Sequence, residues 1–256
     1  MIGQRGIYIK SDQEIALMRE AGRINAQALS AVREAIQPGV STAELDAIAA
    51  EVIRKRGAKP AFLGVPGAYP YPATTTISIN EEMVHGIPGK RKLQEGDIVS
   101  VDCGTIFEGF VGDSAFTAAV GDVSAVAKKL IEVTEKSLYI GIDKLRPGNH
   151  VGDVGAAIQQ YVERQDLHLT REYTGHGVGR EMWEGPQVPN YGIAGRGTLF
   201  RPGMVIAIEP MVLVGTPHTR VLADQWTVAS ADGSLTAHFE HSVAITQNGP
   251  LILTVV

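Results

Sequence analysis

One pattern of elements occurs twice along this chain, and the repeat restricts its fold more than any other feature of the sequence. Each half begins with two helical patterns separated by Pro-Gly, continues with a His-Gly pair and then reaches a β-rich apolar run. In both halves a carboxylate follows six residues after the glycine that opens the run, Asp102 after Gly96 and Glu209 after Gly203. We interpret this as a duplicated α-α-β unit with unequal loops, which predicts that equivalent strand ends meet at one shared cleft.

The helical patterns have recognisable start and stop signals. Each of the first two begins with a capping box, in which a serine is followed three residues later by a glutamate, and the first pattern ends at Pro38-Gly39. Apolar residues at helical spacing fill the segments between these signals. The sequence therefore predicts helices that begin near Ser11 and Ser41, a third over about 123–145 and a fourth that includes 154–162.

The composition is ordinary for a globular chain. Of the 256 residues, 44% are hydrophobic, and the formal net charge of −5 lacks the basic excess of a general nucleic-acid binder, so we expect no DNA partner. Cys103 is the only cysteine, which excludes an internal disulfide and a Cys-rich zinc finger. No apolar stretch reaches the length of a membrane span or has the form of a signal peptide, which predicts a cytoplasmic protein.

The two halves are not separated by a linker rich in serine, glycine or proline. We therefore expect a single domain over residues 1–256, with a short N-terminal extension over 1–10 and pseudo-repeats over about 11–120 and 121–256. Short termini and the lack of a heptad pattern predict a monomer.

Two aspartates lie on consecutive predicted strands. Asp102 ends an apolar run, and Asp113 follows eleven residues later, beyond a turn-like segment at 107–110. If the strands form a hairpin with a two- or four-residue turn, the odd separation places both carboxylates on one face, opposite or diagonal to each other. Buried carboxylates that close repel each other, so either one is protonated or a metal ion lies between them. The alternative is two independent aspartates at turns or strand ends.

Two glutamates and a histidine extend this set in the second half. Glu209 and Glu240 interrupt apolar strands, where a charge is rarely buried unless it is ion-paired in the core or coordinates a metal. His176 lies in the glycine-rich run 175–179, which lacks the following helix that a phosphate loop needs. Four carboxylates and one imidazole suit a two-metal hydrolytic site with Mn, Fe, Co or Zn.

Strand alternation predicts the directions of three neighbouring side chains. Cys103 follows Asp102 directly and is expected to face the other side of its strand, as a packing residue and not a nucleophile. His238 shares the face of Glu240, where it either contacts the metal site or substrate, or lies at the rim bonded to water. His241 has the opposite parity and is expected to point away from Glu240.

Nine short segments in both halves form a combination that is highly specific when taken together. They are 15–22 (IALMREAG), 77–80 (ISIN), 84–88 (VHGIP), 101–102 (VD), 112–113 (GD), 174–180 (TGHGVGR), 186–192 (PQVPNYG), 208–211 (IEPM) and 239–241 (FEH). Through them nearly the whole chain resembles the type I methionine aminopeptidases. The resemblance implies the pita-bread fold, an α/β (α+β) architecture in which duplicated, pseudo-twofold α-α-β halves surround a central antiparallel sheet.

The resemblance also implies an activity, the removal of the initiator methionine from nascent chains whose second residue is small. Two divalent ions, Co, Mn, Fe or Zn, would carry a bridging hydroxide that attacks the peptide carbonyl. Glu209 would also move a proton to the leaving amine, and His85 would hydrogen-bond near the scissile amide. The implied metal ligands are Asp102, Asp113, His176, Glu209 and Glu240.

By position, the resemblance suggests a methionine pocket formed by Phe62, Tyr71, Met182 and Trp226. Where the family has a second histidine that contacts substrate, this sequence has Trp183. An indole donates one hydrogen bond but neither accepts one nor carries positive charge, so it would replace that imidazole only in part. The substitution predicts reduced or retuned activity, with a non-catalytic metal-binding paralogue of the same fold as the alternative.

A prolidase or aminopeptidase P relative is the nearest enzymatic alternative. Such proteins usually carry an additional N-terminal domain, and only about ten residues precede the first predicted helix. The implied partners are nascent polypeptides with an N-terminal methionine. Besides the run 54–56, the only compact basic run is 90–92, which is interpreted as a solvated turn, with a transient contact with ribosomal RNA as the alternative.

Overall fold

The computed structural model describes residues 6–256, so residues 1–5 of the expected N-terminal extension lie outside the described residues. Within the described part of the chain the helices are α1 (Asp12–Ala35), α2 (Thr42–Lys55), α3 (Ala125–Asp143) and α4 (Val151–Glu163). The predicted capping boxes at Ser11 and Ser41 are both formed. All four predicted helices are thus confirmed, and none of those described is long and apolar enough to cross a membrane.

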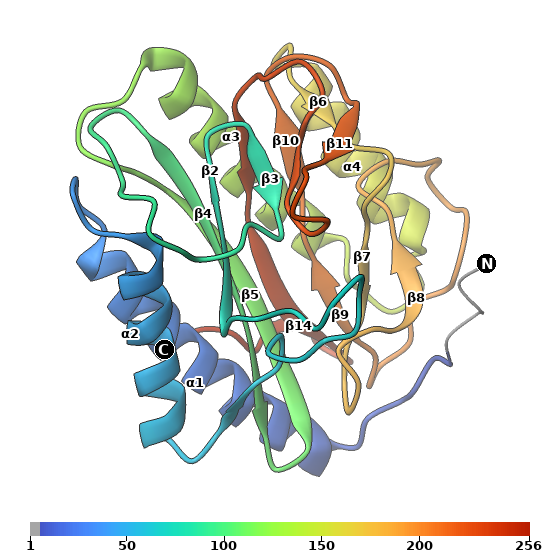
Figure 1. The fold of residues 1–256 in the computed structure, drawn as a ribbon. Helices are drawn as coiled ribbons and strands as arrows, with labels where there is room; N and C mark the ends of the chain where they lie inside the picture. Colours follow the sequence, from blue (N-terminus) through green and yellow to red (C-terminus); the bar gives the residue numbers. More distant parts are fainter. Residues whose placement is uncertain (1–5) are drawn as a thin grey trace.

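A curled antiparallel sheet joins the two halves of the chain (Figure 1). The first half contributes β2, β4 and β5, and the second half contributes β7, β9 and β14, so the predicted duplication is visible in the strand order. The halves join where β14 pairs with β5. Over the described residues the path of the sheet is β1 (Lys59–Pro60), β4 (Ile98–Phe107), β5 (Phe110–Ala119), β14 (Glu240–Thr246), β9 (Val205–Ile208), β7 (Gly175–Gly177) and β8 (Glu184–Val188), with β2 (Thr75–Ile79) on β4 and β15 (Gly249–Ile252) on β14.

Two small sheets complete the strands of the described residues. One contains β13, β10 and β6, and the other contains β11, β12 and β3. Their bounds are β3 (Glu82–Val84), β6 (His168–Leu169), β10 (Met211–Leu213), β11 (Thr219–Val221), β12 (Val228–Ser230) and β13 (Thr236–His238).

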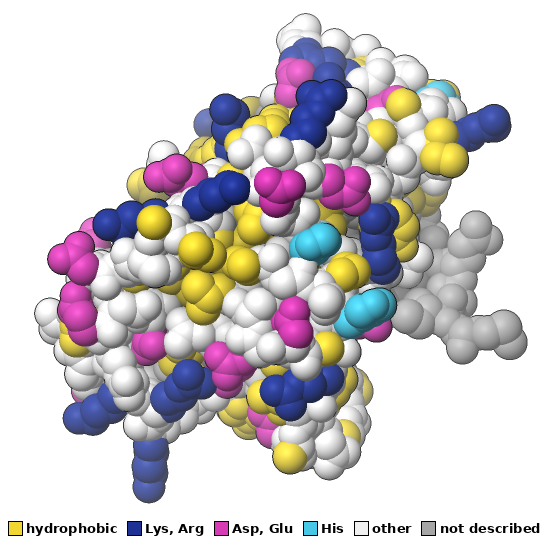
Figure 2. Space-filling model, turned by 90° about the horizontal axis from the view of Figure 1, so that it is seen from above, with side chains coloured by type: hydrophobic (Ala, Val, Ile, Leu, Met, Phe, Trp, Pro, Cys, Tyr) yellow, Lys and Arg dark blue, Asp and Glu magenta, His cyan; other side chains and the backbone are white. Residues whose placement is uncertain are grey.

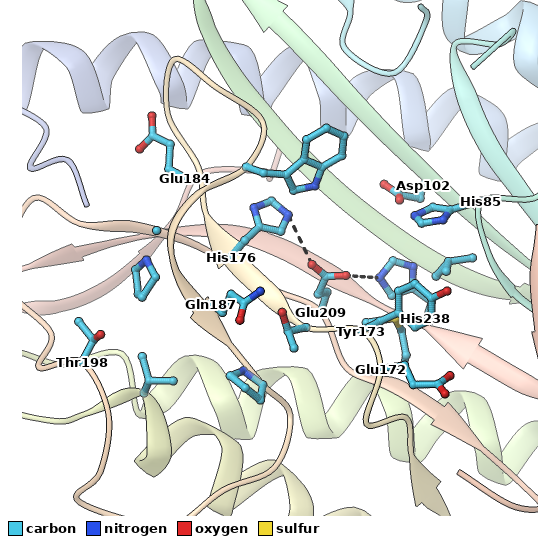
Figure 3. A pocket seen from close by; sticks show the side chains of 18 of the residues that line it. His85, Asp102, Glu172, Tyr173, His176, Glu184, Gln187, Thr198, Glu209 and His238 are labelled. Atoms are coloured by element: carbon cyan, nitrogen blue, oxygen red, sulfur yellow. Dashed lines mark ion pairs between the residues drawn. The ribbon is translucent and has the colours of Figure 1, made fainter. Parts of the chain in front are cut away.

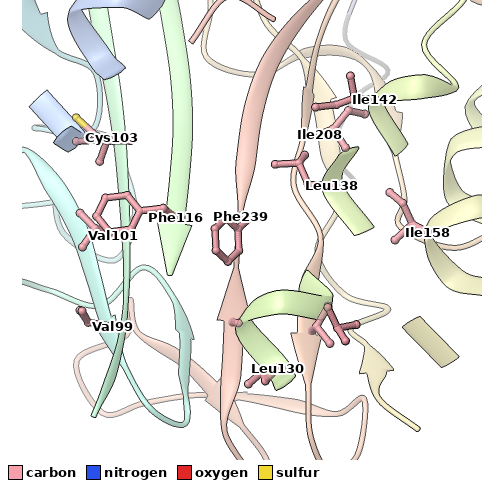
Figure 4. Packing of buried hydrophobic residues seen from close by; sticks show 14 of the residues in the cluster. Val99, Val101, Cys103, Phe116, Leu130, Leu138, Ile142, Ile158, Ile208 and Phe239 are labelled. Carbon is pink, nitrogen blue, oxygen red and sulfur yellow. The ribbon is translucent and has the colours of Figure 1, made fainter. Parts of the chain in front are cut away.

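The central strands have a helix-facing side and an opposite side, which we call the cleft face. α1 packs on β4 and β5, and α3 packs on β5, β9 and β14. Alternate strand residues, such as Val101, Cys103 and Ile208, join residues from the helices in one apolar cluster (Figure 4). The buried position of Cys103 in this cluster confirms that it is a packing residue on the side away from Asp102.

β4 and β5 form the hairpin that the spacing of the two aspartates predicts. Its turn consists of Glu108 and Gly109, both with positive φ (48° and 78°), as a type I′ turn requires. Asp102 pairs with Ala115, which lies two residues from Asp113. The two carboxylates therefore lie diagonally on one face, and the alternative of independent aspartates is wrong.

Candidate active site

Five side chains from both halves of the chain meet on the cleft face. β4 carries Asp102, β5 carries Asp113, β7 carries His176, Glu240 opens β14, and Glu209 follows the last residue of β9. The strand register brings them together, because β14 pairs with both β5 and β9, and β7 also pairs with β9. These are the five residues that the sequence analysis names as metal ligands.

The functional atoms of this group lie within a few ångströms of one another. Nε2 of His176 is 3.4 Å from an oxygen of Glu209 and 3.9 Å from an oxygen of Asp113. The ligand atoms of Asp113, His176 and Glu240 all lie within 4.8 Å of one another, so this group could hold a metal ion. Asp102 is buried as well, whereas Glu209 is partly exposed. Figure 3 shows Asp102, His176 and Glu209 around the same pocket.

Burial and mutual repulsion dominate the electrostatics of the four carboxylates. Burial raises the pKa of Asp113 to about 7. Burial, together with the neighbouring carboxylates, raises the pKa of Asp102, Glu209 and Glu240 well above the usual range. Each of these shifts shows that a negative charge in this position is costly when nothing positive lies beside it.

The donor set fits a divalent cation. One oxygen each of Asp102, Asp113 and Glu240 is buried without a hydrogen-bond partner. Within residues 6–256 the ion pairs of this group are made with imidazoles and not with lysine or arginine, so the salt-bridge alternative for the glutamates is not supported. A divalent cation would offset the repulsion and allow all four carboxylates to ionise, and oxygen ligands with one imidazole suit such an ion.

Local backbone geometry orients His176 toward the carboxylates. Its Nδ1 lies 2.9 Å from the carbonyl oxygen of Gly177, so a proton on Nδ1 leaves the lone pair of Nε2 directed at the cluster. A Cβ on Gly177 would lie 2.1 Å from the carbonyl oxygen of Gly185. Gly177 therefore allows β7 and β8 to approach each other closely. The run is followed by the strand β8 and not by the helix that a phosphate loop needs.

Asn25 is a positioning residue that the sequence analysis missed. It is fully buried on α1, and its amide group donates to the carbonyl oxygens of Cys103 and Gly112 and accepts from the hydroxyl of Ser114. These bonds tie both strands of the hairpin to α1 beside the two aspartates. A polar residue within the apolar stripe of the predicted helix was the available signal.

His85 lies at the edge of the same site, in a constrained conformation. It has φ 61°, which is unusual for a residue other than glycine, and its ring lies 6.1 Å from that of Tyr173 in an edge-to-face arrangement. Burial lowers the pKa of His85 to about 4, so its imidazole is neutral at physiological pH. It can therefore act as a neutral hydrogen-bonding group.

A cavity of about 110 Å³ contains all five predicted metal ligands in its wall. The rest of the wall is mainly apolar and includes Phe62, Tyr71 and Trp226. The rings of Tyr71 and Trp226 pack edge to face, with centroids 5.1 Å apart. The hydroxyl of Tyr71 lies 2.9 Å from the carbonyl oxygen of Gly86, which links this wall to the His85 segment.

Trp183 lines this cavity and also a larger cleft of about 1220 Å³ that continues from it. Glu184, the next residue, is buried and forms an ion pair with Lys10, so the N-terminal segment anchors the loop that carries Trp183. Met182 lies in the apolar cluster that includes Phe62 and Tyr71, and it is not among the residues that line the two cavities. Its position is therefore behind the pocket wall.

The structure separates the two histidines near Glu240 as strand alternation predicts. His238 is 2% exposed, and its Nε2 lies 3.8 Å from an oxygen of Glu209 and 3.9 Å from an oxygen of Glu240. It contacts the carboxylate cluster and is not a solvent-bonded rim residue. His241 points away and lies 2.8 Å from the hydroxyl of Thr254.

The fold and the oxygen-rich site define a class of metal-dependent peptidases, and comparisons with known proteins agree. A family model described as metallopeptidase family M24 matches residues 16–247. Methionine aminopeptidase from Clostridium acetobutylicum is 51% identical over 97% of this chain and 98% of its own length. Methionine aminopeptidase 1 from Bacillus subtilis is 49% identical over 97% and 99%, respectively.

A solved structure extends the likeness to the three-dimensional fold. Methionine aminopeptidase from Thermotoga maritima superposes with a TM-score of 0.95 at 45% identity, and the match covers 98% of this chain and 100% of that one. The chain therefore belongs to metallopeptidase family M24, in its methionine aminopeptidase group. The predicted pita-bread fold is confirmed, and membership of this family implies the use of divalent metal.

Proposed function

We propose that this protein is a metalloaminopeptidase that removes the initiator methionine from nascent polypeptides when the second residue is small. The observation that carries the proposal is one cavity whose wall combines the five ligand residues with an apolar surface of side-chain size. A methionine side chain on the apolar wall would bring the first peptide bond to the carboxylate cluster. The names of the relatives support the same substrate.

Five residues would hold the metal, and we propose two divalent ions from among Co, Mn, Fe and Zn. When bound, such ions polarise the substrate carbonyl and lower the pKa of a bound water. The proposed ligands are Asp102, Asp113, His176, Glu209 and Glu240.

The remaining steps belong to side chains of this chain. Glu209 is the least buried of the four carboxylates, so it is best placed to accept a proton and pass it to the leaving amine. His85 would donate a hydrogen bond near the scissile amide, as its lowered pKa keeps the ring neutral. Phe62, Tyr71 and Trp226 would exclude water around the methionine side chain, with Trp183 at the junction to the larger cleft.

The test is the release of methionine from tripeptides by protein reconstituted with each metal in turn. We expect release from Met-Ala-Ser and not from Met-Leu-Ser, and loss of release in Glu209→Gln. The absence of release with Mn, Co, Fe and Zn alike would instead support the non-catalytic metal-binding alternative that Trp183 suggests. Cleavage of Xaa-Pro dipeptides without cleavage of Met-Ala-Ser would support the prolidase alternative.

The proposal extends to the oligomeric state, cellular location and partners of the protein. We infer a single-domain, cytoplasmic monomer whose partners are nascent chains. On the face shown in Figure 2, basic and acidic side chains are interspersed, so this face presents no extended basic surface. All three residues of the basic run 90–92 are exposed, which supports a solvated segment there. Cosedimentation with ribosomes would test the alternative of a transient contact.

A further inference from the structure

The carboxylate of Glu209 lies between two imidazoles, one beside each oxygen (Figure 3). Its Oε1 is 3.4 Å from Nε2 of His176, a proposed metal ligand, and its Oε2 is 3.8 Å from Nε2 of His238. One oxygen of Glu209 is therefore directed toward the proposed metal, and the other is directed toward a histidine that the proposed chemistry does not use.

The backbone of His238 is held firmly in place. Its N–H donates to the hydroxyl oxygen of Thr117 at 2.9 Å, and its carbonyl oxygen accepts from the same hydroxyl at 2.8 Å. In the register of β10 and β13 it pairs with Met211, two residues after Glu209. Both neighbouring strands therefore fix the backbone position from which the imidazole reaches the carboxylate.

The imidazole of His238 is built into the site without a hydrogen-bond partner at Nε2. The side chain is 2% exposed, and Nε2 is buried without a partner in hydrogen-bond distance. A buried polar atom of this kind is costly unless it acquires a partner in another state of the site. Hydrogen bonds of catalytic groups are often long in the free enzyme and shorten when the site is loaded.

We propose that His238 is a positioning residue that donates a hydrogen bond from Nε2 to Oε2 of Glu209. The bond would hold that carboxylate with Oε1 toward the metal and would leave it oriented to accept a proton. Glu209 is favoured over Glu240 as the partner because its side chain is 13% exposed against 2%, so it has the greater freedom to turn. The inference rests on the proposed function, and it identifies a residue that could compensate in part for Trp183.

Two substitutions and one control test this role. His238→Leu removes the donor, and we expect kcat for Met-Ala-Ser to fall by roughly tenfold with KM within about twofold, as is typical for groups that orient metal ligands. Calorimetric titration of the metal-free protein with Mn should show affinity weakened by about the same factor. His238→Gln keeps an N–H donor at similar reach and should restore most of both losses. His241→Leu, on the opposite strand face, should change neither.

The outcomes separate this inference from the proposed function. If the native protein releases no methionine with any metal, the function fails, and the Mn titration alone decides the role of His238. Weaker affinity in His238→Leu that is restored in His238→Gln supports positioning. The positioning role is overturned if His238→Leu leaves kcat and Mn affinity unchanged. It is also overturned if His238→Gln loses as much kcat and Mn affinity as His238→Leu. Thermal unfolding near the native temperature shows that each variant folds.

Discussion

Both sides of the central strands carry buried side chains, but burial has opposite effects on stability on the two sides. On the helix-facing side, Val101, Cys103 and Phe116 pack into an apolar cluster that removes their surface from water. On the cleft face, one position away, Asp102 and Asp113 are buried with raised pKa values and unpartnered oxygens. One side therefore stabilises the fold, and the other side lowers its stability until a cation is bound.

The difference shows how the fold supports a site that is unfavourable by itself. Strand alternation carries both kinds of residue, so the apolar side fixes the backbone on which the carboxylates are held. Asn25 extends this support, because it reaches from α1 to the hairpin that carries both aspartates. Substitutions on the cleft face should consequently lower activity, whereas substitutions on the helix-facing side should lower the free energy of unfolding.

The largest effect is expected on the cleft face. Asp113→Asn keeps the shape of the side chain but removes a charge from the ligand cluster, and we expect kcat/KM for Met-Ala-Ser to fall by roughly 10³-fold, equivalent to about 4 kcal/mol. Without metal the variant should be no less stable than the native protein, because like-charge repulsion is relieved. Methionine release and urea denaturation in the presence of a chelator would measure the two quantities.

Asp143→Asn is the matched control, since Asp143 is exposed at the end of α3 and pairs with the neighbouring Lys144 and Arg146. It should retain native activity. Native activity in Asp113→Asn would contradict the assignment of that residue to the metal site.

The opposite result is expected on the helix-facing side. Phe116→Ala removes a buried ring that also lies 4.1 Å from the guanidinium of Arg33, and we expect the free energy of unfolding to fall by roughly 3–5 kcal/mol. Activity per folded molecule should stay within about twofold of native. Val126→Ala, at an exposed position of α3, is the control and should change neither. A Phe116→Ala protein with native stability but no activity would contradict the claim that the helix-facing side contributes to stability and not to activity.

The cleft face was largely predictable because its residues break a pattern. Glu209 and Glu240 interrupt apolar runs, and the odd spacing of Asp102 and Asp113 was sufficient to predict that, in a hairpin, they share a face. The first two helices were predictable from their capping boxes, and all four from apolar residues at helical spacing. Both features are local in the sequence, so they need no knowledge of the packing.

The remaining parts of the site depend on contacts between distant segments. Asn25 reaches Cys103, 78 residues away, and the pocket wall joins Tyr71 to Trp226. Neither contact has a periodic signal. Whether His238 is buried at the site or lies at its rim could not be predicted either, because strand alternation gives the direction of a side chain but not what covers it. For Phe62, Tyr71 and Met182 only the family resemblance suggested a role.

A smaller effect, about 2 kcal/mol between pH 5 and pH 7, is expected in the pH dependence of stability without metal. The pKa of Asp113 in the folded protein is about 7, well above its value of 3.8 outside the fold, so the folded state binds this proton more tightly than the unfolded state. Stability is then greatest below about pH 4 for this group and falls as pH rises toward 7, by about 1.4 kcal/mol for each unit of pKa difference.

Bound metal should reverse this trend, because the cation replaces the proton and binds best to ionised ligands. Urea denaturation at pH 5 and pH 7, with chelator and with Mn, would measure both slopes. Stability that rises with pH in the chelated native protein but not in chelated Asp113→Asn would contradict the electrostatic difference between the two sides.

The smallest effect concerns Trp183, which lies where the site meets the larger cleft. Trp183→His would restore an imidazole that both donates and accepts hydrogen bonds, and one added hydrogen bond of about 1 kcal/mol corresponds to about fivefold in rate. We therefore expect a severalfold rise in turnover of Met-Ala-Ser, measured as methionine release. Trp183→Phe serves as the control, because it keeps an aromatic ring but offers no hydrogen bond and should give no gain. An unchanged or lower rate in Trp183→His would show that Trp183 does not limit turnover.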